Sequence, residues 1–165
     1  MRVVLKRLAD AFALLGGVIL LAIVAVTTTN AFAFILDRFA GAFGADVSGL
    51  PGYEDFVQLA ISCAALMFFP YCQGNRGHVS VDLLMDHLPK AVQRGFDLLW
   101  LGVTVIVDVF LSYWMVFGML EVRSDAVVTS VLGWPTWPFY FPGLLSMILW
   151  ALIAVSQAFE GAADA

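Results

Sequence analysis

The chain has 165 residues, of which 62% are hydrophobic and only 13% are charged, and its formal net charge is -5 at pH 7. A soluble domain usually has about 45–50% apolar and about 25% charged residues, so this composition excludes an ordinary soluble domain and indicates an integral membrane protein of one domain. Because most of the basic residues are gathered at the N-terminus and in one central segment, nothing in the charge pattern suggests nucleic-acid binding.

Four stretches of the chain are long and apolar enough to cross a bilayer as helices. An α-helix rises about 1.5 Å per residue, so roughly 20 apolar residues cross a hydrocarbon core of about 30 Å. The spans predicted on this basis are residues 11–36, 56–75, 97–120 and 138–158. Prolines early in the last apolar stretch place the start of the fourth helix at Pro138 or Phe139. The predicted fold is an all-α integral membrane protein with four transmembrane helices.

The distribution of basic residues predicts the orientation of the chain. Positively charged short loops stay on the cytoplasmic side of a membrane. The N-terminus and the connection between the second and third spans hold most of these residues: Arg2, Lys6, Arg7, Arg76, Lys90 and Arg94. Both termini are therefore predicted to be cytoplasmic. The N-terminal segment also resembles a cleavable secretory signal, but its apolar run exceeds the about 7–15 residues of a signal core, so we expect it to remain as a span.

Short amphipathic segments are predicted at the membrane surface after the first and second spans. Residues 37–53 combine glycines and small residues with scattered apolar ones, which suits the outer interface. Residues 78–88 mix charged and apolar side chains and end before Pro89, which suits the cytoplasmic interface. Before the fourth span, residues 134–140 concentrate aromatic rings, and we expect them to anchor the chain at the outer membrane surface.

The sequence does not supply the parts of a catalytic site. No nucleophile with a matching base can be assembled, so we expect neither enzyme activity nor a cofactor. His78, Asp82 and Asp86 recur at four-residue intervals and could in principle hold a divalent metal, but their charge-mixed surroundings favour a solvated helix face. The two histidines, His78 and His87, lie in one short stretch rather than on facing spans, which argues against a haem anchor.

Three acidic residues within or next to the spans require a physical account. Asp108 lies near the middle of the third span, where an aspartate costs on the order of 2.5–3.5 kcal/mol, so it is expected to face protein or water. A helix–helix contact, including one with a partner protein, is favoured there over an ion or proton site. Glu54 and Asp55 open the second span, where the helix macrodipole alone would favour acidic residues, and a partner contact remains open.

Three motifs give the chain a resemblance to a known family. Residues 75–84 read NRGHVSVDLL and are followed by Leu88-Pro89. This stretch resembles the Gly-His-(Ile/Val)-x-(Val/Ile)-Asp signature after the second span of the DctQ-type small membrane subunit of tripartite ATP-independent periplasmic (TRAP) transporters. Glu54-Asp55 is similar to an acidic pair in that family, and residues 133–138 match a looser aromatic and proline pattern. One departure is that many members carry an arginine soon after the first helix, whereas Arg38 comes late here.

The resemblance implies a part in secondary transport across the bacterial inner membrane. It implies sodium-driven uptake of organic acids, usually carboxylates, together with a large multi-helix membrane subunit and a periplasmic solute-binding protein. The small subunit would brace the large one and would not hold the substrate. Consistent with that role, the sequence lacks the internal repeats and clustered polar groups of a midplane binding site. The residues expected to make partner or assembly contacts are Glu54, Asp55, Arg76, His78, Asp82 and Asp108.

Two other functional classes remain open from the residues alone. A small homo-oligomeric channel would need a polar stripe through its interface, and only Asp108 offers a start. A membrane anchor for a redox or signalling complex would need haem-ligating histidines within the spans or a soluble partner domain. Neither class accounts for the stretch from His78 to Leu84.

Overall fold

A computed structural model describes residues 2–41, 44, 47–75 and 89–163. In these residues the chain forms five α-helices and one short 3-10 helix, and it forms no β-strand. The helices are α1 (Arg2–Ala40), α2 (Tyr53–Met67), α3 (Phe69–Gly74), α5 (Lys90–Ser124), η2 (Trp137–Phe139) and α6 (Tyr140–Ala163). The fold class predicted from the sequence, an all-α protein, is confirmed.

Four helical stretches are long and apolar enough to cross a membrane, as the sequence predicts. They are Val3–Ala40, Tyr53–Gly74, Val92–Ser124 and Trp137–Phe159. The 39 residues of α1 and the 35 residues of α5 exceed the roughly 20 residues that cross a hydrocarbon core. These two helices must therefore tilt in the bilayer or project beyond it.

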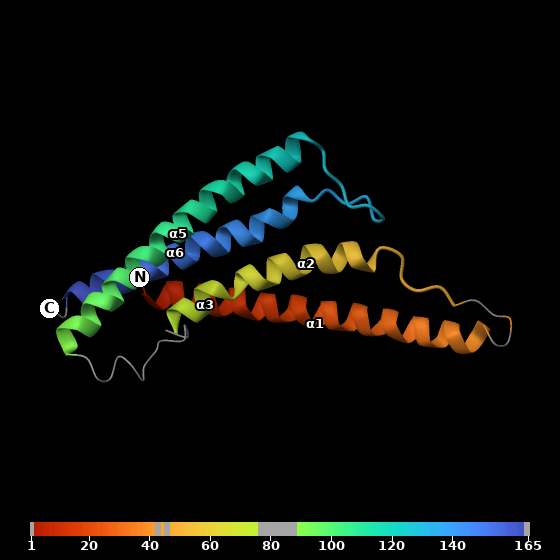
Figure 1. The fold of residues 1–165 in the computed structure, drawn as a ribbon, viewed down its shortest axis with the longest axis horizontal. Coiled ribbons are helices and arrows are strands. Elements are labelled where there is room, and N and C mark those ends of the chain that lie inside the picture. The colour runs from red at the N-terminus through yellow and green to blue at the C-terminus, as the bar shows by residue number, and fades with distance from the viewer. Residues whose placement is uncertain (1, 42–43, 45–46, 76–88, 164–165) are drawn as a thin grey trace.

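The helices are arranged around α6, which contacts α1, α2, α3 and α5 (Figure 1). α1 lies against α2, whereas α5 packs mainly on α6 and η2. Both termini lie at the same end of the bundle, which we call the terminal end, and the connection from α5 to α6 lies at the opposite, distal end (Figure 1). α5 is therefore attached to the rest of the chain chiefly through one seam with α6.

A proline separates α2 from α3 and leaves a carbonyl for α6 to bind. Pro70 has no N–H to donate to the carbonyl of Leu66 four residues earlier, so the helix is interrupted at Phe68. The hydroxyl of Ser146 on α6 donates a hydrogen bond to that Leu66 carbonyl oxygen at 2.6 Å. Ser146 is fully buried, so an unpaired carbonyl at this point would be costly. The interruption thereby becomes a point of attachment between the second and fourth spans.

Small residues let the helices approach closely. A Cβ atom added to Gly16 on α1 would lie 3.3 Å from the carbonyl oxygen of Ala64 and 3.3 Å from the Cβ of Met67, both on α2. A Cβ atom added to Gly143 on α6 would lie 2.6 Å from Cδ1 of Leu66. In lipid, helices associate through such close packing because no hydrophobic driving force brings them together.

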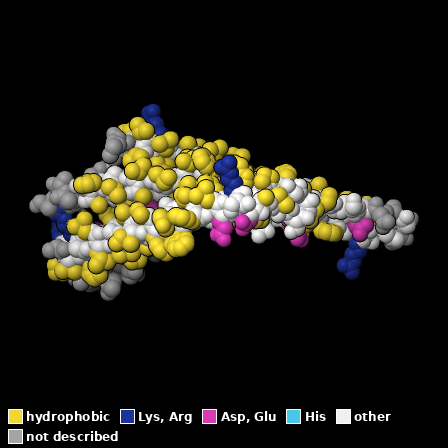
Figure 2. All heavy atoms as spheres, turned by 90° about the horizontal axis from the view of Figure 1, so that it is seen from above, with side chains coloured by type: hydrophobic (Ala, Val, Ile, Leu, Met, Phe, Trp, Pro, Cys, Tyr) yellow, Lys and Arg dark blue, Asp and Glu magenta, His cyan; other side chains and the backbone are white. Residues whose placement is uncertain are grey.

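The outside of the bundle is strongly apolar. Figure 2 shows a face covered largely by hydrophobic side chains, with few charged side chains among them. Large exposed hydrophobic residues lie along α1 and α5 in particular, including Leu14 and Leu21 on α1 and Ile106 and Phe110 on α5. A soluble monomer rarely exposes so wide an apolar surface, whereas a bilayer or a membrane partner would cover it.

The contact at Gly16 yields a prediction with a control beside it in the sequence. Gly16→Leu should destabilise the bundle by about 1–3 kcal/mol, because the new side chain must push α2 away. Gly17→Leu should have little effect, because nothing lies within 4 Å of a Cβ atom at Gly17. Thermal unfolding of the purified variants in detergent measures both. Equal losses of stability would show that the α1–α2 approach at Gly16 is not a tight contact.

Candidate assembly site

The two acidic residues at the start of α2 differ in their contacts: Asp55 bonds to a distant part of the chain, whereas Glu54 is exposed. Oδ2 of Asp55 accepts hydrogen bonds from the backbone N–H groups of Val131 at 2.7 Å and Leu132 at 2.9 Å. Glu54 is exposed, and its Oε1 accepts a hydrogen bond from the Tyr53 hydroxyl at 3.1 Å. Asp55 therefore fastens the connection between α5 and α6 to the second span, while Glu54 remains on the surface.

The connection that Asp55 holds has a hairpin-like structure of its own. Val128 and Pro135 form an isolated antiparallel bridge. The N–H of Thr129 donates to the carbonyl of Trp134 at 2.9 Å, and the N–H of Trp134 donates to the Thr129 hydroxyl oxygen at 3.0 Å. Gly133 supplies the left-handed backbone that this turn requires, with φ at 65°. The distal end of the bundle thus carries an ordered loop rather than a loose linker.

Aromatic rings join this loop to the neighbouring helices. The guanidinium of Arg123, in the last turn of α5, lies 5.0 Å from the centre of the Trp137 ring in η2. The rings of Trp134 and Phe139 are stacked with centres 6.4 Å apart. A cation over a tryptophan face is attracted by the ring quadrupole. The aromatic run expected to anchor the membrane surface therefore also makes contacts within the chain.

The connection after α1 is tied to the side chains of α1. Asn30 is buried, and its Oδ1 accepts a hydrogen bond from the N–H of Leu50 at 2.9 Å. Oδ1 of Asp37 accepts a hydrogen bond from the N–H of Val47 at 3.0 Å. The amphipathic surface segment expected here stays a prediction, because these contacts place its described end against α1 without placing a membrane surface.

A buried polar network joins α3 to α6 near the terminal end. Nε2 of Gln73 donates to Oε1 of Gln157 at 2.7 Å, and Nε2 of Gln157 donates to the backbone carbonyl of Gln73 at 2.8 Å. Nε1 of Trp150 donates to Oε1 of Gln73 at 3.2 Å, and the Trp150 ring stacks on Phe69 at 4.7 Å. Sequence reasoning missed this network, because an isolated glutamine near the end of a span carries no local sign of its partner.

Asp108 lies inside the chain, on the face of α5 that packs against α6. Asp108, Ser112 and Met115 follow one another at spacings of four and three residues and so share a helix face. The register is fixed by Met115, whose Cε lies 3.0 Å from a Cβ atom built on Gly143 of α6. Asp108 is 0% exposed, and neither its two carboxyl oxygens nor Oγ of Ser112 has a hydrogen-bond partner in the described part of the chain.

This placement bears on the expected partner contact of Asp108. The third span does turn its aspartate toward protein and away from lipid, as the energetic cost of a lipid-facing carboxyl requires. The protein that surrounds it is this chain's own α5–α6 seam. A contact between Asp108 and a partner protein stays a prediction.

The remaining expected contacts, Arg76, His78 and Asp82, lie outside the described residues, as does the metal alternative built on His78. Among the residues that the structure describes, no three His, Cys, Asp or Glu side chains gather closely enough to hold a metal ion. Cys63 is a buried free thiol whose Sγ donates to the Phe139 carbonyl oxygen at 3.0 Å. The candidate site is therefore a set of contacts between helices and loops, without a catalytic centre in the described region.

Comparison with known proteins gives one match. The model of a family described as tripartite ATP-independent periplasmic transporters, DctQ component, matches residues 38–164, which is most of the chain. No curated protein and no solved structure matches the chain.

The contrast between Asp55 and Glu54 leads to a prediction about the connection between α5 and η2, residues 125–136, which we call the distal loop. Asp55→Ala should raise the hydrogen-exchange rates of the Val131 and Leu132 amides by roughly tenfold, because their shared acceptor is lost. Glu54→Ala removes the same charge from the adjacent residue and should leave those rates unchanged. Hydrogen-exchange mass spectrometry of the 127–136 segment compares the two. Unchanged exchange rates in Asp55→Ala would show that Asp55 does not hold the distal loop in place.

The unpaired carboxyl of Asp108 leads to a second prediction. A buried polar group without a partner costs about 1–3 kcal/mol, so Asp108→Leu should leave the stability of the purified chain unchanged or raise it. Asp108→Asn, which keeps a polar group of similar shape, serves as the comparison. Thermal unfolding in detergent measures both. A marked loss of stability in Asp108→Leu alone would mean that the carboxyl has a bonding partner, such as a buried water.

Proposed function

Because this chain belongs to the DctQ-component family of tripartite ATP-independent periplasmic transporters, we propose that it is the small subunit that braces the large membrane subunit of such a system. The chain is a transporter component and not an enzyme. Transporters of this kind combine a large membrane subunit with a periplasmic binding protein. The proposal adds that this chain supports the large subunit mechanically and leaves the substrate and the coupling ion to it.

The observation that carries the bracing role is a set of polar attachments between parts of the chain that are distant in sequence. At three separated points a polar side chain bonds to a distant helix or loop: Ser146 to Leu66, Asp55 to the distal loop, and Gln73 to Gln157. A transport site at the membrane midplane would instead direct polar groups and discontinuous helices at a water-filled cavity. Polar side chains that bond to distant parts of the same chain favour a rigid support over a substrate path.

The finer parts of the proposal rest on family resemblance. We propose organic acids, usually carboxylates, as the transported class and sodium as the coupling ion, in a bacterial inner membrane with both termini in the cytoplasm. Both termini and the start of α5 lie at one end of the bundle (Figure 1), and the first turns of α1 and α5 carry Lys6 and Lys90, which supports this orientation. The six residues named from the sequence remain proposed partner or assembly contacts, and the exposure of Glu54 suits that role: Glu54, Asp55, Arg76, His78, Asp82 and Asp108.

The structure gives less support to a homo-oligomeric channel. A channel would need a polar stripe on a surface that faces other copies of the chain. The exposed side of α5 around Asp108 instead carries Ile106, Val109 and Phe110, and Asp108 itself is buried against the chain's own helices. A redox or signalling anchor, the other class that the residues left open, gains no support from the family match.

Transport by the reconstituted system tests the proposal. Proteoliposomes would contain the large subunit and the binding protein, with or without this chain, and uptake of radiolabelled carboxylates would be measured under an imposed sodium gradient. We expect uptake only when this chain is present. Equal uptake without it, from preparations shown to be folded, would contradict an obligatory bracing role.

The kinetics separate a brace from a substrate-binding subunit. Gly16→Leu, which should loosen the α1–α2 contact, is expected to lower the maximal rate of uptake in proportion to the amount of intact complex and to leave the KM for carboxylate and for sodium unchanged. Gly17→Leu is the matched control. A shifted KM would show that this chain contributes to the substrate or sodium site.

A further inference from the structure

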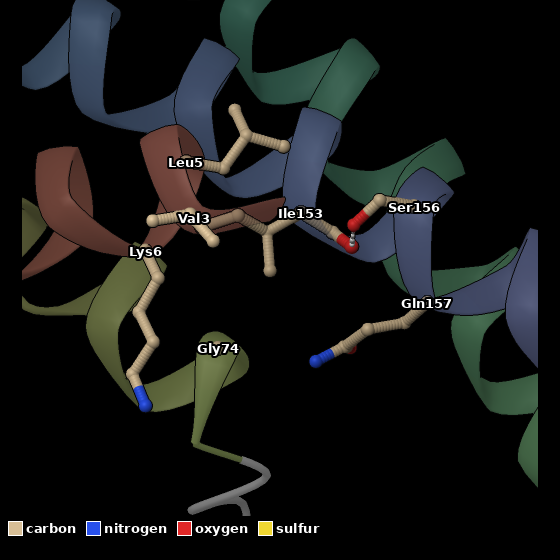
Figure 3. A pocket seen from close by; sticks show the side chains of 7 residues that line it. All are labelled: Val3, Leu5, Lys6, Gly74, Ile153, Ser156 and Gln157. Atoms are coloured by element: carbon tan, nitrogen blue, oxygen red, sulfur yellow. Dashed lines mark hydrogen bonds between the residues drawn. The ribbon is translucent and has the colours of Figure 1, made fainter. Parts of the chain in front are cut away.

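A cavity of about 310 Å³ lies at the terminal end of the bundle, between the start of α1, the end of α3 and the last turns of α6 (Figure 3). Its volume falls at the lower end of the about 300–1,000 Å³ of small-ligand pockets. The residues that line it include Val3 and Lys6 from α1, Gly74 from α3, and Ser156 and Gln157 from α6. The proposed transport function assigns nothing to this cavity.

The cavity is apolar on one side and polar on the other. Leu5 and Ile153 line it and belong to the hydrophobic cluster that also contains Ala9 and Leu149. Lys6 and Gln157 supply the polar side, and in Figure 3 the amide nitrogen of Gln157 points into the space between the helices. A ligand that fits both sides must itself be amphipathic.

The polar side offers hydrogen-bond donors. The Gln157 amide group carries two N–H bonds, of which one is used by the carbonyl of Gln73, while Oε1 accepts from the Gln73 side chain. A second N–H is therefore left for a ligand. Lys6 is exposed and pairs with no carboxylate in the described residues, and its ammonium group supplies a positive charge and further donors. Donors beside a positive charge suit an anion such as phosphate.

The position of the cavity indicates which anion. It lies where the spans end: Lys6 precedes the charge-free run that begins at Ala11, and Gly74 closes the second span. Beyond Asp10, exposed apolar side chains lie along one face of α1 at Leu14, Val18 and Leu21. An acyl chain lying against these side chains would have its headgroup near the first turns of α1, the part of the helix that lines the cavity. Basic pockets between membrane helices bind anionic lipid headgroups in this way.

We propose that this cavity binds the headgroup of an anionic phospholipid, with the phosphate held by Lys6 and Gln157 and an acyl chain along the exposed apolar side chains of α1 from Leu14 to Leu21. The lipid would fill the gap between the first span and the α3–α6 network at the end of the bundle. It would thereby join elements that no hydrogen bond of the described residues joins at this point. The proposal does not depend on the transport function, because every group that it uses belongs to this chain.

Native mass spectrometry of the purified full-length chain tests the proposal. The chain is titrated with phosphatidylglycerol, with phosphatidylcholine of the same acyl chains, and with inorganic phosphate alone. We expect phosphatidylglycerol to bind more tightly than phosphatidylcholine, and inorganic phosphate neither to bind nor to displace it. Lys6→Gln should weaken phosphatidylglycerol binding about fivefold, and Lys6→Arg should retain it.

A matched control separates the cavity from general surface charge. Lys90→Gln removes the same charge from an exposed lysine at the same end of the bundle that does not line the cavity, so it should leave the affinity unchanged. Equal weakening by Lys6→Gln and Lys90→Gln would overturn the proposal in favour of diffuse attraction. Equal affinity for the two lipids would overturn it as well. Binding of inorganic phosphate alone with the same dependence on Lys6 would assign the cavity to a free anion and not to a lipid.

Discussion

In the hydrocarbon core of a bilayer there is no water to satisfy a polar group, so a polar group without a partner in the protein is costly there. This constraint explains the connections between the spans of this chain. Where Pro70 leaves the Leu66 carbonyl without its helical partner, Ser146 of α6 donates to it. Where Gln73 and Gln157 are buried, each donates to the other residue. The central position of α6 follows, because two of the described buried attachments to the second span begin on it.

The same constraint sets what the sequence could predict. The length and apolarity of four stretches report burial in lipid directly, so the number of spans and the all-α class followed from local pattern alone. Pairing is different, because it joins residues 76 to 84 positions apart, such as Asp55 with Val131 and Gln73 with Gln157. The sequence identifies Asp55 as an acidic residue at a helix start, and the helix macrodipole is a sufficient local reason for it. Its actual acceptor role depends on where the distal loop folds back, which no local pattern states.

The sequence predicts the burial of Asp108 but not the element that buries it. The energetic argument that a mid-span aspartate avoids lipid predicted its burial, and Asp108 is indeed fully buried. The same argument could not say which protein buries it. The seam with α6 is set by the register of Met115 against Gly143, a contact that depends on a small residue in a distant helix. An unpaired carboxyl in that seam reduces the stability of the chain on its own, which is a reason to look for its role in the assembled transporter.

The two ends of the bundle differ in how they are closed. At the distal end, Asp55 holds the loop between α5 and α6 through backbone hydrogen bonds, and Arg123 lies over Trp137. At the terminal end, the Gln73–Gln157 network borders a cavity that Lys6 also lines. A brace can transmit force only through its closed contacts, because open space yields before packed side chains do. In the proposed bracing role, an anionic lipid in this cavity would couple the support of the large subunit to the composition of the membrane.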